Sequence, residues 1–121
     1  MTEIQNSKPY DLEARTLAFA KRVREFVRRL PKTPANYEDG RQLIRASGSI
    51  GANYIEANES LGKKDFSLHI RISRKEAKES AFWLKLVHTG NEGTLDYERH
   101  ALIQEAEELM KIFGSILKKS S

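Results

Sequence analysis

The fold is decided by the stretch Arg45-Ala46-Ser47-Gly48-Ser49-Ile50-Gly51-Ala52-Asn53-Tyr54-Ile55-Glu56-Ala57. The apolar residues that return at helical spacing in and before this stretch are Leu43, Ile50, Tyr54 and Ala57. Such spacing places them on one side of a helix. Gly48 and Gly51 each cost about 1 kcal/mol relative to alanine inside a helix. We therefore predict a central helix that lies close to another backbone and is contacted on more than one side.

A polar stripe runs along the same helix and has two possible roles. Its members are Gln42, Arg45, Ser49, Asn53, Glu56 and Ser60. It could line a ligand pocket or a nucleic-acid contact, or it could form a buried hydrogen-bonded network that sets helix register, also across subunits. Because Asn53 borders the apolar side, we favour the structural network. We assign to it Arg45, Ser49, Asn53, Glu56 and, from the next helix, Glu79.

The rest of the chain predicts three more helices and no strand. Asp11 is a candidate N-cap for a helix that runs to about residue 30, and Thr33-Pro34 begins the central helix, which runs to about residue 60. A third helix is expected over residues 63–89. After a turn at residues 90–93, Thr94 or Asp96 is expected to cap the fourth.

Short turns between these helices make sequence neighbours antiparallel. The prediction is an all-α, up-down-up-down antiparallel four-helix bundle over residues 11–119. Residues 1–10, which end in Pro9-Tyr10, are expected to form a flexible N-terminal arm.

Composition limits the class of protein. The 121 residues suit a single domain, and the absence of cysteine excludes disulfides and thiolate chemistry within the chain. The sequence has no signal-peptide pattern and no apolar run of about 20 residues. We expect a soluble, cytoplasmic protein that does not enter a membrane.

A basic face on the first helix is the main candidate binding surface. Its members are Arg15, Lys21, Arg22, Arg24, Arg28, Arg29 and Lys32. At about 100° per residue they project away from the apolar seam, and only Glu25 interrupts them. Such a face is either a solvated surface or a site for RNA or DNA. Binding there would follow phosphates and shape rather than base sequence.

Apolar residues beyond the core seams predict an oligomer interface. They lie on the second and third predicted helices and are Ile44, Ile55, Ile72, Trp83 and Leu86. One bundle neighbour on each side does not cover so wide an apolar arc, and surplus apolar surface is typical of subunit contacts.

The polar residues form no recognisable catalytic or metal-binding pattern. None of the three histidines, His69, His88 and His100, has a glutamate three residues before it, as a di-iron bundle requires. Ser49 and Ser73 lack an evident histidine base or oxyanion loop. We expect no enzyme activity, no metal or other cofactor, and no small-molecule substrate.

Several motifs together resemble a known family. They are Arg45-x-x-x-Ser49-Ile50-x-x-Asn53-x-x-Glu56, Lys64-Asp65-Phe66, Glu79-Ser80-x-x-Trp83-Leu84 and Leu30-Pro31-Lys32-Thr33. Over residues 11–118 the chain resembles the bacterial four-helix-bundle proteins encoded in ribosomal RNA intervening sequences. The resemblance implies a cytoplasmic homopentameric ring. It also extends to the accessory variability determinant protein of diversity-generating retroelements, a basic pentamer that binds nucleic acid and a reverse transcriptase.

Together these patterns predict a non-enzymatic, homo-oligomeric helical bundle that presents a basic surface to RNA or a ribonucleoprotein. A reverse transcriptase or another nucleic-acid enzyme is a further candidate partner. The alternative is a protein-binding scaffold whose basic surface is incidental.

Overall fold

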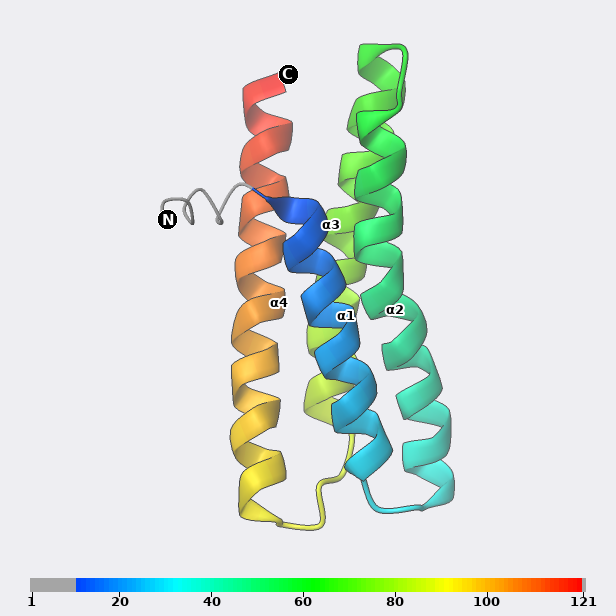
Figure 1. Cartoon of the computed structure of the whole chain (residues 1–121), viewed down its shortest axis with the longest axis vertical. Coiled ribbons are helices and arrows are strands. Elements are labelled where there is room, and N and C mark those ends of the chain that lie inside the picture. Colours follow the sequence, from blue (N-terminus) through cyan, green and yellow to red (C-terminus); the bar gives the residue numbers. More distant parts are fainter. Residues whose placement is uncertain (1–10, 121) are drawn as a thin grey trace.

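The computed structural model describes residues 11–120, and this part of the chain folds into four α-helices without a strand (Figure 1). The helices are α1 (Leu12–Arg29), α2 (Pro34–Asn58), α3 (Lys63–Leu86) and α4 (Gly93–Ser120). The predicted all-α bundle is therefore confirmed. The predicted arm over residues 1–10 lies outside the described residues.

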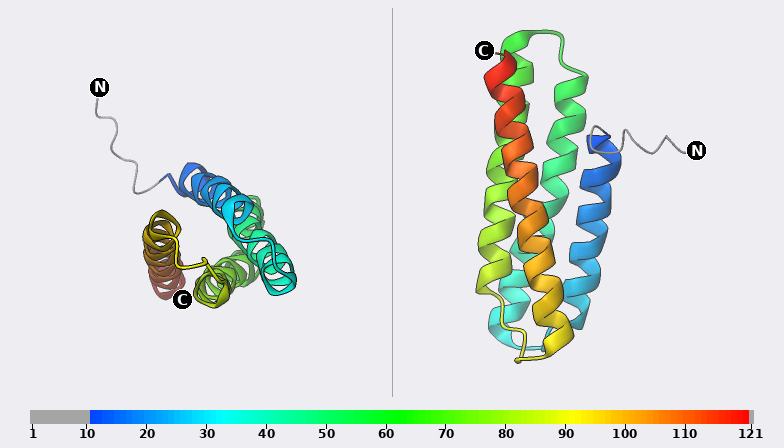
Figure 2. Two further views of the ribbon diagram at one scale, coloured as in Figure 1. Left: turned by 90° about the horizontal axis from the view of Figure 1, so that it is seen from below. Right: turned by 90° about the vertical axis from the view of Figure 1, so that its left-hand side faces the viewer.

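The helices surround one core in the order of the sequence. α1 contacts α2 and α4, and α3 contacts the same two helices from the other side (Figure 2). Successive helices run in opposite directions, as the short turns predict (Figure 1). The prediction that α2 is contacted on more than one side is confirmed, because both α1 and α3 pack against it.

Each helix contributes one apolar seam to the core. The largest fully buried apolar side chains are Phe19, Phe26, Phe113, Leu43, Ile50, Ile70, Leu84, Leu102 and Leu109. Among the buried polar side chains, Thr16 donates its hydroxyl to the Leu12 carbonyl at 2.7 Å, and Ser73 donates across the core to the Ile50 carbonyl at 2.9 Å. These bonds satisfy polar groups that would otherwise be costly to bury.

The C-terminal end of α3 differs from the sequence prediction. α3 ends at Leu86 rather than at residue 89, because the residues that follow are held in an extended loop by side chains of other helices. Arg99 of α4 donates to the Val87 carbonyl at 2.7 Å, and Asn36 of α2 accepts from the His88 amide at 2.9 Å. Neither partner is local in sequence, so the helical pattern of residues 63–89 does not reveal the break.

The cap of α4 is Glu92, and the prediction of Thr94 or Asp96 was wrong. Glu92 precedes the helix, and its carboxylate accepts from the backbone amides of Leu95 at 3.0 Å and Thr94 at 3.3 Å. Thr94 itself donates its hydroxyl to that carboxylate at 2.6 Å. These bonds lower the pKa of Glu92: the bond from the Thr94 hydroxyl has the largest effect, and the two backbone amide bonds come next. Asp96 instead accepts from the Thr89 hydroxyl.

Replacing Glu92 with glutamine is expected to make the stability difference from wild type depend on pH. A carboxyl whose pKa is lowered on folding contributes stability above its unfolded pKa and loses it as the pH falls through the folded pKa. The E92Q variant should melt at a lower temperature at pH 7, and the difference should narrow as the pH falls below the ordinary glutamate value of 4.5. Thermal melts from pH 7 to about pH 3.5 measure this. Glu56→Gln, at an exposed position of α2, is the control and should show no such narrowing. A constant difference for E92Q would contradict the charged cap.

Candidate nucleic-acid interface

The structure divides the predicted basic face of α1 into two groups. Three of its arginines meet α4. Arg15 makes a two-pronged ion pair with Glu105, at 2.7 and 2.9 Å, and a third bond to Glu108 at 2.8 Å. Arg22 lies 3.4 Å from Glu98, and Arg29 donates to the Thr94 hydroxyl at 3.0 Å.

The spacing of these arginines explains the pairing. Residues seven apart lie on one side of a helix, so Arg15, Arg22 and Arg29 form a line along α1. Their partners Glu105, Glu98 and Thr94 follow in the reverse order along α4, because the two helices are antiparallel. The hydrogen bond that Arg15 donates to Glu105 is the largest cause of the raised pKa of Arg15. Arg15 therefore helps to dock α1 on α4 and offers less free charge than the sequence implies, whereas Arg22 and Arg29 contact α4 from exposed positions.

The other four members are exposed: Lys21, Arg24 and Arg28 on the outer side of α1, and Lys32 in the turn that follows it. We call Lys21, Arg24, Arg28 and Lys32 the outer basic stripe. The Arg24 guanidinium donates to the Ala20 carbonyl, and Lys32 donates to the Arg28 carbonyl. Arg28 pairs with Glu25, the acid that the sequence places within this face. The stripe thus has four cations and one acidic neighbour on its own helix.

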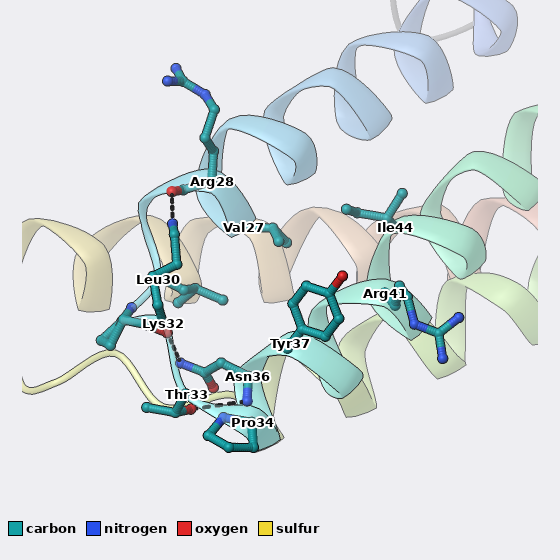
Figure 3. Close-up of a pocket in the computed structure, with 11 residues that line it drawn as sticks. Val27, Arg28, Leu30, Lys32, Thr33, Pro34, Asn36, Tyr37, Arg41 and Ile44 are labelled. Carbon is teal, nitrogen blue, oxygen red and sulfur yellow. Dashed lines mark hydrogen bonds between the residues drawn. The ribbon is translucent and has the colours of Figure 1, made fainter.

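An open pocket continues this stripe at the corner where α1 passes into α2 (Figure 3). Its volume is about 620 Å³. The residues that line it are Val27, Arg28, Leu30, Pro31, Lys32, Thr33, Pro34, Asn36, Tyr37, Arg41 and Ile44. We call this cavity the corner pocket. It joins two members of the outer basic stripe, Arg28 and Lys32, to an exposed tyrosine and an arginine of α2.

Sequence reasoning missed the contribution of α2 to this surface. Tyr37 and Arg41 lie one helical turn apart on α2, outside the apolar seam that contains Leu43 and Ile50. An exposed tyrosine beside an arginine at that spacing was an available signal. It did not indicate a pocket, because the other wall belongs to α1 and to the turn after it.

Asn36 holds the turn between α1 and α2 in place. Its side-chain amide donates to the Pro31 carbonyl at 3.0 Å and to the His88 carbonyl at 2.7 Å, while its oxygen accepts from the His88 amide. This buried side chain therefore ties the α1–α2 turn to the α3–α4 loop. The Thr33 hydroxyl, which caps α2, accepts from the backbone amide of Asn36 at 3.1 Å. The corner pocket is thus built on a braced turn.

Within the single chain the predicted polar network is only partly buried: Arg45 and Glu56 are exposed, whereas Ser49, Asn53 and Glu79 are half-buried. Arg45 of α2 is within 3.5 Å of Glu76 and 3.3 Å of Glu79 on α3, and its side chain is 52% exposed. The reason is that these residues lie along the outer edge of the α2–α3 contact rather than in the core. The stripe does link the two helices, as the structural reading requires.

The C-terminal half of the network has different partners. Asn53 donates to the Ser49 carbonyl and hydroxyl, and its oxygen lies 3.2 Å from a ring nitrogen of His69, which the sequence did not include. Glu56 is exposed, and its side chain joins no member of the network within residues 11–120.

The residues predicted to form an oligomer interface have two kinds of environment. Ile55 and Leu86 are 46% and 51% exposed. Ile44, Ile72 and Trp83 are half-buried, and Ile44 and Trp83 pack against the core. Phe82, which the sequence analysis left out, is 56% exposed and stacks edge-on against Trp83 with ring centroids 5.1 Å apart. Assembly through this surface stays a prediction.

Residues 11–120 contain no cluster of three or more histidine, aspartate or glutamate side chains that could hold a metal ion. His69 instead lies 3.5 Å from Asp65, one turn earlier on α3. Over the same residues, no helix combines the length and apolar character needed to cross a membrane.

This chain is similar to a known protein family and to a solved structure. The model of the 23S rRNA-intervening sequence protein family matches residues 10–115. A solved structure from Bacteroides thetaiotaomicron VPI-5482, a protein of unknown function from the S23 ribosomal protein family, is 28% identical with a TM-score of 0.76. That similarity covers 88% of this chain and 97% of the other. No curated protein matches.

Proposed function

The chain belongs to the 23S rRNA-intervening sequence protein family, and from this premise we propose that it is a non-enzymatic bundle that binds RNA through the outer basic stripe of α1. One observation carries the proposal. Lys21, Arg24 and Arg28 stay exposed on α1 and Lys32 on the turn after it, although three other arginines of α1 contact α4. Neither family description above names an enzyme.

The chemistry of such a stripe favours phosphate. Exposed lysine and arginine side chains neutralise phosphates and release bound counterions, so affinity falls as salt rises. Lys21 has no bonding partner among the described residues, and the ion pair of Arg28 with Glu25 is solvent-exposed and therefore weak. Both can turn to an RNA backbone at little cost.

Reversing two charges of the stripe is expected to weaken RNA binding. The variant Lys21→Glu/Arg24→Glu changes residues that do not line the corner pocket. Each lost phosphate contact should reduce the slope of log K against log salt by about 1, so the double variant should lose about 2. Fluorescence anisotropy with a short labelled RNA, titrated at several salt concentrations, measures both affinity and slope.

A charge-matched variant separates the stripe from net charge. Lys111→Glu/Lys119→Glu makes the same change in net charge at exposed positions of α4. It should bind RNA more tightly than the α1 variant, and circular dichroism should show both proteins folded. Equal weakening by the two variants would mean that only total charge matters. A wild-type protein that binds no RNA at low salt would reject the proposal.

A protein-binding scaffold is the second candidate, and the surface around Phe82 favours it. Phe82 and Leu86 are each more than half exposed, and a cavity of about 240 Å³ lies beside Phe82 between α3 and α4. An aromatic side chain next to a cavity is typical of a protein contact. We propose that copies of this chain associate here, and light scattering that finds only a monomer at micromolar concentration would reject it. The homopentameric ring is part of this proposal.

A further inference from the structure

We infer that the corner pocket binds one base of a single-stranded RNA, which stacks on Tyr37 while the neighbouring phosphates meet the cations around the pocket. The inference rests on the proposed RNA binding and adds a site to it. It concerns the turn between α1 and α2, whereas the proposed function requires only the exposed side of α1.

The pocket has the size and the lining that a base requires. Its volume of about 620 Å³ lies within the usual range for small-ligand sites. The apolar part of its wall is formed by Val27, Leu30, Pro31, Pro34 and Ile44. No carboxylate lines it, so nothing in the wall repels a phosphate that follows the base.

Tyr37 is the residue that selects a flat ring. Its side chain is 73% exposed although it stands over an apolar pocket, and its hydroxyl makes no hydrogen bond within residues 11–120. In Figure 3 the ring extends into the space between Val27 and Ile44. An aromatic ring presented in this way offers a stacking surface to any base, which makes the contact tolerant of sequence.

Three of the residues that line the pocket are cations. Arg28 and Arg41 extend away from Tyr37 on opposite sides, and Lys32 lies at the turn (Figure 3). Such a placement suits the phosphates on the two sides of one nucleotide. Arg28 and Arg41 pair with Glu25 and Glu38, but these pairs are between exposed side chains and contribute little. A phosphate can replace either acid.

The same geometry favours single strands over other polyanions. In a duplex the bases are stacked on one another and cannot enter a pocket, whereas an unpaired base can be splayed out. An acidic peptide would meet the cations but has no base to place on Tyr37. The inferred ligand is therefore a nucleotide of a single-stranded segment.

The test uses two labelled strands of equal length and charge, one a mixed-sequence RNA and the other abasic. The wild-type protein should bind the base-containing strand more tightly by about fivefold or more, the low end of what a lost stacking contact costs. Tyr37→Ala should remove this preference and leave the abasic affinity unchanged. Tyr37→Phe should keep the preference, because the ring remains.

Tyr97→Ala is the matched control, since Tyr97 is an equally exposed tyrosine on α4 that does not line the pocket. It should bind both strands as wild type does. A preference that survives in Tyr37→Ala, or an acidic peptide that competes as well as the base-containing strand, would overturn the inference. Equal wild-type binding of the two strands would overturn the pocket and leave the proposed function standing. No binding of either would overturn both.

Discussion

Replacing Asn36 with alanine is expected to lower the free energy of unfolding by about 2 kcal/mol or more. The side chain is 4% exposed and makes three hydrogen bonds, two to carbonyls and one to the His88 amide. Each buried group that loses its partner costs about 1–3 kcal/mol. The gain in helix propensity from alanine is only about half of 1 kcal/mol and does not offset this. Urea denaturation followed by circular dichroism measures the change.

A second readout identifies the mechanism. The His88 amide should exchange with solvent hydrogen faster in Asn36→Ala, because its acceptor is gone. Asn58→Ala is the control, since Asn58 is exposed at the end of α2 and reaches Glu13 only at 3.5 Å. It should change stability by less than about 0.5 kcal/mol. An equally small effect of Asn36→Ala would mean that the α1–α2 turn and the α3–α4 loop do not depend on the hydrogen bonds of Asn36, which we call the Asn36 clamp.

Two glycines of α2 are expected to respond oppositely to alanine. A Cβ added at Gly51 would lie 2.7 Å from the Thr16 hydroxyl oxygen and 3.1 Å from the Thr16 Cβ. Thr16 is buried and its hydroxyl is bonded to the Leu12 carbonyl, so relief requires α1 to move. Overpacking of this kind costs about 1–3 kcal/mol. We expect Gly51→Ala to lower the melting temperature despite better helix propensity.

Gly48 is the matched position one turn earlier. The nearest atom to an added Cβ is the end of the flexible Arg24 side chain, at an ordinary contact distance of 3.5 Å. Gly48→Ala should therefore gain up to about 1 kcal/mol from helix propensity and raise the melting temperature. Melting curves of the two variants test the pair. Equal stabilisation by both would contradict the close contact between Gly51 of α2 and Thr16 of α1.

These glycines also show what local sequence can reveal. Two glycines in a strongly periodic helix predicted a close neighbouring backbone, and α1 approaches closely at Gly51 but not at Gly48, where only the end of the Arg24 side chain lies nearby. The contact with Thr16 was not predictable, because the spacing within α2 contains no information about the register of α1. The basic face of α1 was likewise only partly predictable. Its direction away from the core followed from the period of α1, but its pairing with Glu98, Glu105 and Glu108 depends on α4.

The sequence by itself determined the four helices, their apolar seams and their antiparallel order. These features depend on contacts between residues a few positions apart, such as the cap that Asp11 offers to the Ala14 amide, and on turns too short for any other path. The tertiary structure alone decided the Asn36 clamp, the end of α3, the division of the α1 arginines and the corner pocket. Each joins residues distant in sequence, and their positions depend on how the helices rotate and slide against one another as the core packs.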